Sequence, residues 1–412
     1  MAVRPSRDVS LLFATRSLRL FAYGFLAVVL VLYLSAAGLS EGRIGLLLSL
    51  TLLGDTALSL WITTHADRVG RRRMLLLGAV MMLLAGVLFA STTSFWLLLL
   101  AATVGIISPA GNEVGPFLAI EQAALSETVP ATERTRVFSW YALTGSFATA
   151  LGSLAGGGLS QLLQSRGATA LQANRTVVLG YAALGALLLL LFARLGPAVE
   201  PPAAGRVEKR PSFLEPGLGL RGSRRVVFRL SSLFALDAFA GGFVVQSFVA
   251  WWFHARFGAD EGMLGAIFFG ANVLAGISAL SAGWLARRFG LVNTMVFTHL
   301  PSNVLLLLVP LMPTFPLAVG VLLLRFSVSQ MDVPTRQSYT MAVVTPAERS
   351  AAAGVTGIAR TVGSSLAPLL AGPLFAVPAL ASVPFFVAGG LKIVYDLLLW
   401  RDFRKVKPPE ES

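Results

Sequence analysis

The chain contains no cysteine, which excludes disulfides, thiolate metal ligands and cysteine nucleophiles. Only three of its 412 residues are histidine, too few and too scattered for a histidine cluster on a metal. Charged residues make up 13% of the chain, whereas a soluble globular domain has about 25%. The Walker A, G-x-S-x-G and H-E-x-x-H motifs are also absent, which argues against an ATP-driven pump and against a hydrolase. We therefore expect no enzyme, no cofactor and no bound metal.

What the chain has in abundance is apolar side chains. They make up 55% of the residues, and the mean hydropathy is +0.75, which is typical of a protein that crosses a membrane several times. The net charge of +13 comes from basic residues in short clusters between apolar runs, without the basic stripe and interleaved aromatic residues of a nucleic-acid groove. The expected surroundings are therefore a lipid bilayer, and nucleic acid is not an expected partner.

Twelve apolar runs are long enough to be membrane helices, which need about 20 predominantly apolar residues each. They lie at 18–37, 44–64, 74–92, 95–120, 137–163, 176–195, 230–253, 263–285, 292–311, 315–340, 351–374 and 380–400. Arg4 and Arg7 precede the first run as in a signal peptide, but no clean cleavage site follows, so we expect this helix to be retained. The predicted fold class is an all-α membrane protein with twelve transmembrane helices.

The charges of the loops predict how these helices are oriented. Lys and Arg are concentrated in alternate loops and in both terminal segments, whereas the loops at 91–94, 312–314 and 377–383 carry neither. Because basic loops stay on the cytoplasmic side, both termini and the long middle loop are expected in the cytoplasm of a multi-pass cell-membrane protein.

A polar segment divides the chain into two halves. Residues 196–225 are rich in Pro, Gly and charge, which is typical of a linker. The expected organisation is an N-terminal six-helix bundle at 1–195, a cytoplasmic linker at 196–228, a C-terminal six-helix bundle at 229–402 and a cytoplasmic tail at 403–412.

The two halves repeat one another in sequence. The segment "GLSEGRIG" at 38–45 matches "GADEGMLG" at 258–265, 220 residues later. Two further matches pair "TTHADRVGRRR" with "GWLARRFGLVN" and "EQAALSETVPATERTR" with "RQSYTMAVVTPAERSA", at 63–73 with 283–293 and 121–136 with 336–351. The charged loop between helices 2 and 3 therefore has a counterpart between helices 8 and 9, as expected of an internal repeat.

The six-plus-six arrangement, the long middle loop and the charged loop together resemble the major facilitator superfamily over essentially the whole chain. The loop is similar to the family's G-x-x-x-D-R-x-G-R-R pattern, but Thr63 replaces the first glycine, and the second copy has Arg287 in the acid position. The resemblance implies two pseudo-symmetric six-helix bundles in which helices 1, 4, 7 and 10 line a central cavity. We expect the transporter to be a monomer.

We interpret the charged loop and its counterparts as a gate on the cytoplasmic side. Gly70 permits a tight turn, and Asp67 suits the N-terminal dipole of a helix in the other half. The arginines are expected to contact Glu133 on a neighbouring loop. The alternative is that they only set the topology. The predicted gate residues are Asp67, Arg68, Gly70, Arg71, Arg72, Glu133, Arg134, Gly283, Arg287, Arg288, Gly290, Glu348 and Arg349.

Polar residues inside apolar helices are costly and are therefore candidates for function. On helix 10, four such residues follow a spacing that places them on one helical face, namely Arg325, Ser329, Asp332 and Arg336. The candidate substrate-binding residues are Arg325, Tyr23, Asn112 and Gln246, and the candidate proton carriers are Asp237, Glu113, Asp332 and Asp55. For Asp237 and Glu113 the alternative is a structural pair with a neighbouring arginine. Asp55 lies in helix 2, outside the expected cavity, and its alternative is a contact with helix 11.

Several other residues are expected to be structural. Arg19 is interpreted as a cytoplasmic anchor and His299 as a structural residue, while Pro109 and Pro116 are expected to kink helix 4. The segment "LGSLAGGG" at 151–158 is similar to the G-P-x-x-G-G motif of antiporters in the family, but it has Ser where Pro is expected. Close packing of helices explains its small residues without any antiport.

These features favour an alternating-access secondary transporter of a small molecule that is driven by the proton gradient. Proton-coupled antiport that exports a drug or metabolite is the leading hypothesis. The alternative is a proton symporter or facilitator that imports a small anionic or zwitterionic metabolite, which Arg325 would favour. A receptor or scaffold that does not transport is a third possibility, of another class.

Overall fold

The computed structural model describes residues 7–113, 115–130, 133–200, 220, 222–345 and 348–406, except for the side chains of residues 134, 135 and 350. Most of the expected linker at 196–228 and the last part of the expected tail at 403–412 lie outside these residues. The described chain is built of α-helices with three short 3-10 turns and contains no strand. The predicted all-α membrane fold is therefore confirmed.

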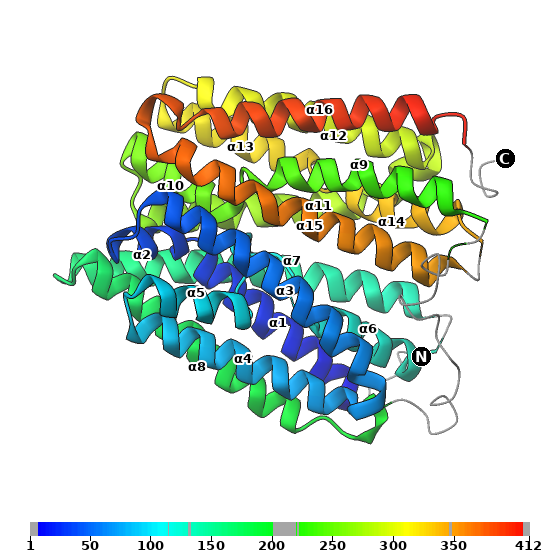
Figure 1. Cartoon of the computed structure of the whole chain (residues 1–412), viewed down its shortest axis with the longest axis horizontal. Coiled ribbons are helices and arrows are strands. Elements are labelled where there is room, and N and C mark those ends of the chain that lie inside the picture. Colours follow the sequence, from blue (N-terminus) through cyan, green and yellow to red (C-terminus); the bar gives the residue numbers. More distant parts are fainter. Residues whose placement is uncertain are drawn as a thin grey trace. The chain divides into compact units, whose positions relative to one another are not determined.

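The helices form twelve successive segments, one for each predicted span (Figure 1). The first six are α1 (Arg7–Ala27) with α2 (Leu30–Ala36), α3 (Glu41–Val69), α4 (Arg71–Ser91), α5 (Phe95–Val104) with α6 (Phe117–Thr128), α7 (Arg134–Ser165) and α8 (Ala170–Ala193). The last six are α9 (Arg224–Gly242) with α10 (Gln246–Phe257), α11 (Glu261–Phe289), α12 (Leu291–Leu308), α13 (Phe315–Val328) with α14 (Asp332–Ala342), α15 (Arg349–Ala376) and α16 (Val383–Phe403). By length and composition, nine of the described segments could cross a membrane.

The first, fourth, seventh and tenth segments are broken, where the sequence predicted continuous helices. In the fourth, the chain leaves the helix between α5 and α6, so the kinks expected at Pro109 and Pro116 are in fact an interruption. In the tenth, a short interruption at 329–331 separates α13, which carries Arg325, from α14, which carries Asp332 and Arg336.

The break in the seventh segment shows how such interruptions are stabilised. At the start of α10, the Ser247 hydroxyl lies 2.7 Å from the carbonyl oxygen of Ala27 and 2.5 Å from that of Pro109. The Ser247 amide also donates to the Pro109 carbonyl, at 3.2 Å. Ala27 ends α1 and Pro109 lies in the α5–α6 break, so one serine satisfies carbonyls that two interrupted helices leave free. Broken helices are tolerated at membrane depth only where other groups pair the freed backbone.

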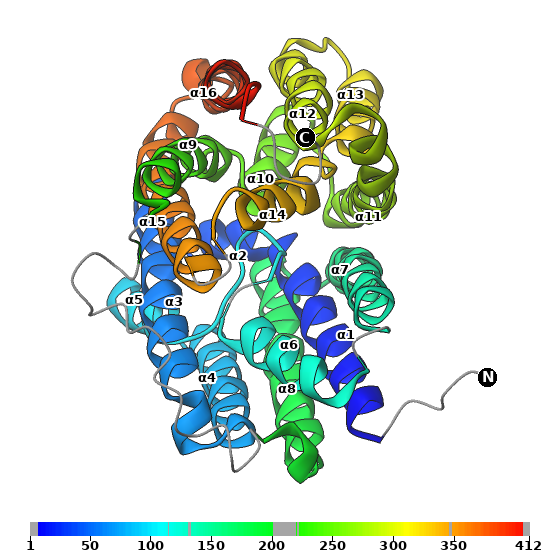
Figure 2. The same ribbon diagram turned by 90° about the vertical axis from the view of Figure 1, so that its right-hand side faces the viewer.

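The first compact unit comprises residues 1–208 together with residues 245–272. In it, α1 packs against α7 and α8, and α4 packs against α8 (Figure 2). The α1–α7 approach is very close, since a Cβ atom at Gly152 or Gly156 would lie 2.0 or 2.1 Å from the carbonyl oxygen of Phe21 or Phe25. Close packing thus accounts for the small residues of segment 151–158.

The second compact unit comprises residues 209–244 and 273–412. Here α9, green in Figure 1, lies against α15, orange, and α12 packs against α16. The core between these helices is formed by buried apolar and aromatic side chains that include Leu230, Phe234, Met295, Tyr339, Tyr395 and Leu399.

The sequence repeat is visible in the backbone. Gly70, between α3 and α4, has a φ of 116°, and its counterpart Gly290, between α11 and α12, has a φ of 81°. Both turns need a conformation that side-chain-bearing residues rarely adopt. Likewise, Glu133 precedes the first residue of α7, and the matching Glu348 precedes the first residue of α15.

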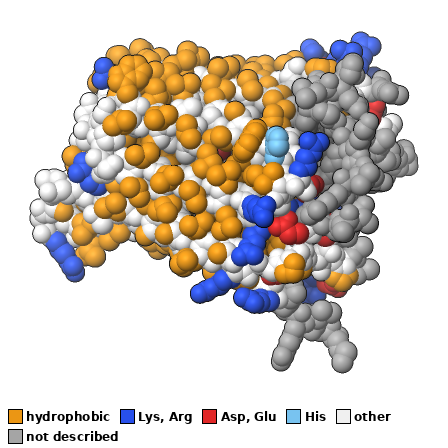
Figure 3. Space-filling view, turned by 60° about the horizontal axis from the view of Figure 1, so that its bottom comes forward, with side chains coloured by type: hydrophobic (Ala, Val, Ile, Leu, Met, Phe, Trp, Pro, Cys, Tyr) orange, Lys and Arg blue, Asp and Glu red, His pale blue; other side chains and the backbone are white. Residues whose placement is uncertain are grey.

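The outer surface is apolar over large areas. Figure 3 shows one face on which hydrophobic side chains cover a broad region and Lys and Arg lie toward its margins. Large apolar side chains are widely exposed, for example Trp96, with 74% of its surface accessible, and Leu190, with 59%. Exposed apolar area of this extent is what a multi-pass membrane protein presents to lipid.

Candidate functional site

Two arginines of α1 form the centre of a buried charged cluster in the first unit. Arg19 donates to both carboxylate oxygens of Glu121 in α6, at 2.6 and 2.8 Å, and to Glu113 in the α5–α6 break, at 2.8 Å. Arg16 also pairs with Glu113, at 2.8 Å. Tyr141 of α7 donates to Glu121. Arg19 is fully buried, so its expected role as a cytoplasmic anchor is wrong.

This cluster, which we call the N-terminal brace, is electrically balanced. Its two arginines face two glutamates, and Glu121 accepts an additional hydrogen bond from the hydroxyl of Thr15, at 2.9 Å. It ties α1 to α6, to α7 and to the α5–α6 break. Paired and fully hydrogen-bonded charges of this kind hold elements in a fixed arrangement, so we assign the brace a structural role.

Asp55 lies in the same unit but is not part of the brace. It occupies the middle of α3 and is 6% exposed. Its Oδ1 atom has no hydrogen-bond partner among the described residues, and no ion pair to a cation is found there. The neighbours that act on it electrostatically include the Gly115 amide and Glu113, and neither is a cation. Asp55 is therefore a buried acid without a counter-charge.

The second unit contains a larger charged cluster centred on Asp237 of α9. Lys392 of α16 lies 2.5 Å from the carboxylate, Arg336 of α14 lies 3.1 Å from it, and Arg360 of α15 lies 3.5 Å from it. Arg336 also pairs with Asp332, at 3.1 Å. We call these five residues, together with the groups described next, the C-terminal cluster. A single carboxylate is thus shared by three cations.

A histidine and a second aspartate extend the C-terminal cluster. His299 of α12 lies 2.9 Å from Asp396 of α16 and 3.9 Å from Asp237. Asn303, one turn further along α12, donates to the other oxygen of Asp396, at 2.8 Å. His299 was expected to be structural, and it is in fact the link between the two aspartates.

Arg325 of α13 is a different case. Asp237 and Asp332 are near enough to act on it electrostatically, but it forms no ion pair within the described part of the chain. Its buried Nε atom has no hydrogen-bond partner there, and its nearest ring contact is with the adjacent Phe326. The Nη1 atom of Arg360 forms its 3.5 Å ion pair with Asp237 without the geometry of a hydrogen bond. The C-terminal cluster therefore contains guanidinium groups whose hydrogen-bonding capacity is not fully used.

The remaining candidates for substrate binding lie in the first unit. Tyr23 is fully buried in α1. Asn112 is exposed in the α5–α6 break, where its backbone carbonyl accepts from Ser108 at 2.7 Å. The Gln246 side chain lies at the start of α10, within 3.4 Å of the Ser153 hydroxyl and 3.3 Å of Asn272.

The gate loop is organised around Arg71. Its guanidinium donates to Asp67, at 2.9 Å, and to both oxygens of Glu127 in α6, at 2.7 and 2.9 Å. The Glu200 carboxylate accepts from the backbone amides of Arg71 and Arg72, at 2.8 and 3.2 Å, and so caps the N-terminus of α4.

The predicted contact between these arginines and Glu133 is wrong. Glu133 pairs with Arg136, at 3.8 Å, and Glu127 near the end of α6 is the residue that pairs with Arg71. Arg72 reaches the Ala193 carbonyl, at 2.5 Å, and Arg68 is exposed. The side chain of Arg134 lies outside the described residues.

In the second half, a glutamate also accepts hydrogen bonds from backbone amides at a helix N-terminus, but the helix is α9 and not α12, the counterpart of α4. Glu348 accepts from the amides of Gly222 and Ser223, at 2.8 and 3.0 Å, at the N-terminus of α9. Arg349 donates to the Met341 carbonyl, at 3.0 Å. Gly283, Arg287 and Arg288 are exposed on α11.

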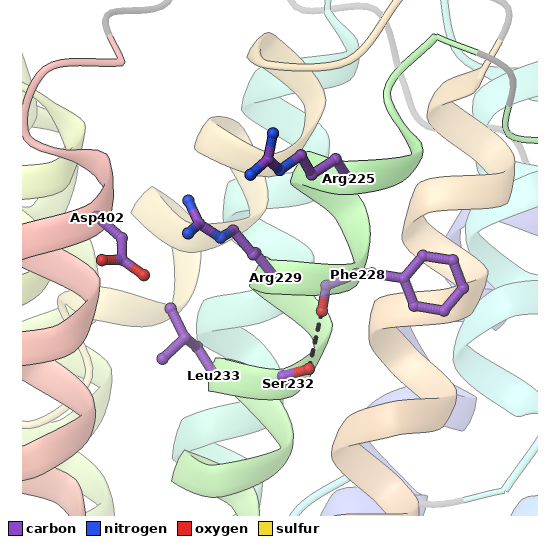
Figure 4. A pocket seen from close by; sticks show the side chains of 6 residues that line it. All are labelled: Arg225, Phe228, Arg229, Ser232, Leu233 and Asp402. Carbon is purple, nitrogen blue, oxygen red and sulfur yellow. Dashed lines mark hydrogen bonds between the residues drawn. The ribbon is translucent and has the colours of Figure 1, made fainter.

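A small surface hollow lies along the first half of α9, beside the last turn of α16 (Figure 4). Its lining consists of Arg225, Phe228, Arg229, Ser232, Leu233 and Asp402. Asp402 is already paired with Arg401, at 3.0 Å. No candidate site residue from the sequence lines this hollow. No group of three or more potential metal ligands occurs among the described residues.

The sequence did not point to Lys392, Arg360 or Asp396. Lys392 and Asp396 lie one helical turn apart in an otherwise apolar helix, which is a recognisable signal in a membrane protein. Arg16, Glu121 and Glu127 were also missed. These three residues lie outside the predicted spans at 18–37 and 95–120, so a search for charge inside those spans did not reach them.

Comparisons with known proteins agree on one fold. A family model described as Major Facilitator Superfamily matches residues 12–368. An uncharacterized membrane protein of Saccharomyces cerevisiae is 31% identical over 419 residues, which cover 96% of this chain and 93% of the yeast protein.

Solved structures show the same architecture. The nucleoside transporter NupG has a TM-score of 0.73 at 14% identity and covers 97% of this chain and 99% of its own. A D-xylose–proton symporter has a TM-score of 0.72 at 17% identity and covers 97% and 98%. At these identities, the likeness establishes the fold alone.

Proposed function

This chain belongs to the major facilitator superfamily, and we propose that it is a proton-coupled secondary transporter that moves a small molecule across the membrane by alternating access. The observation that carries the proton coupling is Asp55, a buried carboxylate in the middle of α3 without a cation partner among the described residues. We propose Asp55 as the proton carrier. Proton coupling is compatible with the fold, which the D-xylose–proton symporter shares.

The other candidate acids are poorly suited to take up and release a proton. Asp237 is shared by three cations, Asp332 pairs with Arg336, and Glu113 pairs with two arginines. Protonating any of them would leave buried cations without a counter-charge, which is costly. At Asp55, binding a proton instead removes a buried charge that nothing offsets.

The surroundings of Asp55 support this assignment. The titratable groups that interact with it are Glu113, Tyr23 of α1 and Tyr181 of α8. Glu113 is held by Arg16 and Arg19, so the group beside Asp55 that could compete for its proton is already committed to an ion pair. A proton on Asp55 therefore has no competing acceptor with a free negative charge among these neighbours.

The placement of the protein is also part of the proposal. The pattern of basic loops supports cytoplasmic termini in a cell membrane. On that side, Arg71 fastens α3, α4 and α6 through Asp67 and Glu127, and we propose that this network acts as a latch whose rearrangement accompanies opening. We propose a monomer as the transporting form.

The experiment begins with a screen for small molecules that raise the thermal stability of the purified protein. A hit is then used in proteoliposomes with an imposed pH gradient, and proton flux and substrate flux are recorded together. Their relative direction separates symport from antiport. We expect Asp55→Asn to bind the substrate but to lose transport driven by the pH gradient.

The control for this variant is Glu41→Gln, which removes an acid from the first turn of the same helix. It should behave as the wild type. If Asp55→Asn retains the wild-type response to the pH gradient, Asp55 is not the proton carrier. If the wild type moves its substrate independently of pH, the proposed proton coupling is wrong.

A further inference from the structure

The C-terminal cluster contains more positive than negative charge. Its cations are Arg325, Arg336, Arg360 and Lys392, and its carboxylates are Asp237, Asp332 and Asp396. One positive charge is therefore uncompensated even when His299 is neutral. The N-terminal brace, by contrast, contains two arginines and two glutamates.

The distances show which cation of the cluster is least balanced by a carboxylate. Lys392, at 2.5 Å, and Arg336, at 3.1 Å, are the closest partners of Asp237, and Arg336 also holds Asp332. Arg360 is further away, at 3.5 Å, and its side chain is 35% exposed, whereas the other members of the pairs around Asp237 are nearly inaccessible. Arg360 is thus at the open edge of the cluster.

Two arginines of the cluster also have N–H groups that do not form a hydrogen bond with any described residue. The Nε atom of Arg325 is buried and lacks a hydrogen-bond acceptor within the described residues, and the Nη1 atom of Arg360 forms only a 3.5 Å ion pair with Asp237, without the geometry of a hydrogen bond. An arginine cannot relieve this cost by losing its proton, since it stays charged in proteins. Buried polar atoms without partners are rare in native structures and call for an explanation.

We propose that Arg360 and Arg325 bind the anionic group of the transported molecule, a small organic oxyanion such as a carboxylate or a phosphate ester. This inference deepens the proposed transport function and rests on it. Planar guanidinium groups suit such oxyanions because they offer several donors in a fixed geometry. Asp237 has a supporting role, since Lys392 and Arg336 are its closer partners and Arg360, at 3.5 Å, is the longest-range and most exposed of the three. The excess positive charge of the cluster disfavours a cationic substrate.

The test is equilibrium binding at one pH, without any gradient. Purified full-length protein is titrated with matched compounds that differ only in charge: monocarboxylates and phosphate monoesters, their neutral amides or alcohols, and the corresponding amines. We expect one class of oxyanion to stabilise the protein against heat, and its neutral and cationic analogues to have no effect.

Variants then connect the binding to these residues. Arg360→Gln and Arg325→Gln should each weaken binding of the anion by about 10- to 100-fold, the effect of removing a hydrogen bond to a charged group. Arg360→Lys keeps the charge and should lose less affinity than Arg360→Gln. Arg404→Gln is the control, because Arg404 is exposed near the end of the same unit and stacks on Trp400.

The outcomes are distinguishable from those of the proton experiment. If Arg360→Gln elutes as a folded monomer and binds the oxyanion with wild-type affinity, the assignment is wrong. It is also wrong if neutral analogues stabilise the wild type equally, or if no oxyanion does. Repeating the titration in nanodiscs with and without anionic lipid separates a free anion from a lipid headgroup, and binding of the lipid alone would overturn the assignment to substrate. Asp55→Asn should bind the oxyanion normally, so failure of the proton proposal leaves this test intact.

Discussion

The Arg19–Glu121 pair offers a direct measurement of what holds the N-terminal brace together. Both side chains are fully buried, and two hydrogen bonds of 2.6 and 2.8 Å join them. Replacing one partner alone, as in Arg19→Met or Glu121→Gln, leaves a buried charge without its main counter-charge. Breaking a buried pair in this way costs about 3–5 kcal/mol. We expect both single variants to unfold at clearly lower temperature than the wild type.

The double variant, in which Arg19 and Glu121 are both replaced, measures the interaction energy between these two residues. It removes one positive and one negative charge, and it leaves Arg16 and Glu113 paired at 2.8 Å, so the cluster is balanced again. The double variant should therefore be more stable than the sum of the two single losses implies, by about 0.5–3 kcal/mol, as found for residues in contact.

Thermal unfolding in one detergent, followed by tryptophan fluorescence at a single scan rate, ranks the variants even if unfolding is irreversible. Arg166→Gln serves as the control, because Arg166 is exposed at the end of α7. Strictly additive losses in the double variant would show that the two residues do not act as a pair. Substrate affinity should be unchanged in the folded variants, since the brace has no unused charge to offer.

Three further predictions concern the C-terminal cluster, the latch and the topology. Asp237→Asn should destabilise the protein by about 3–5 kcal/mol, and adding Lys392→Met should recover part of that loss in the same thermal assay; no recovery would refute the shared-carboxylate arrangement. Asp67→Asn should loosen the arginine it holds and change spin-label distances across the cytoplasmic side, while substrate affinity stays within about threefold because the latch affects only the balance of states; unchanged distances would contradict the latch. Since the chain has no cysteine, a single cysteine introduced between residues 201 and 219 should react only with permeant reagents in intact cells, whereas one at position 166 should react with impermeant reagents; the reverse pattern would invert the topology.

The helices could be predicted from the sequence because apolar length is a strong signal in membrane proteins. The breaks could not, because the evidence for them is distant in sequence. The sequence marks the α9–α10 interruption only by Gly241 and Gly242, a residue type that is also frequent in continuous membrane helices, and no proline lies there. What makes it possible is Ser247, which pairs with carbonyls of Ala27 and Pro109 far away along the chain. Such partners are visible only in three dimensions.

The candidate site was predictable to the extent that intramembrane charge is rare and costly. This reasoning found Asp237, Asp55 and Arg325 from the sequence. It could not say which charges meet, because pairing depends on how α9, α14, α15 and α16 pack. Lys392 and Arg360 were missed because they lie on segments 12 and 11, outside the helices that the family resemblance assigns to the cavity.

The two halves share one plan of broken helices but carry unbalanced charge of opposite sign, and this contrast leads to a last prediction. Unit 1 contains a buried carboxylate without a cation, Asp55, and unit 2 contains a surplus cation at Arg360 and Arg325. A proton bound to Asp55 and an oxyanion bound to Arg360 and Arg325 would neutralise both charges. A protein with fewer uncompensated buried charges changes conformation at a lower cost in free energy.

On this reasoning the proton and the anion travel together, which favours the symport alternative over the antiport that the sequence first suggested. A monoanion and a proton carry no net charge. In proteoliposomes, uptake of the anion should therefore follow an inwardly directed proton gradient and respond little to a potential imposed with potassium and valinomycin. Anion movement opposite to the proton gradient would refute the pairing, and so would a rate that depends strongly on the potential, because a charged complex would then be crossing the membrane.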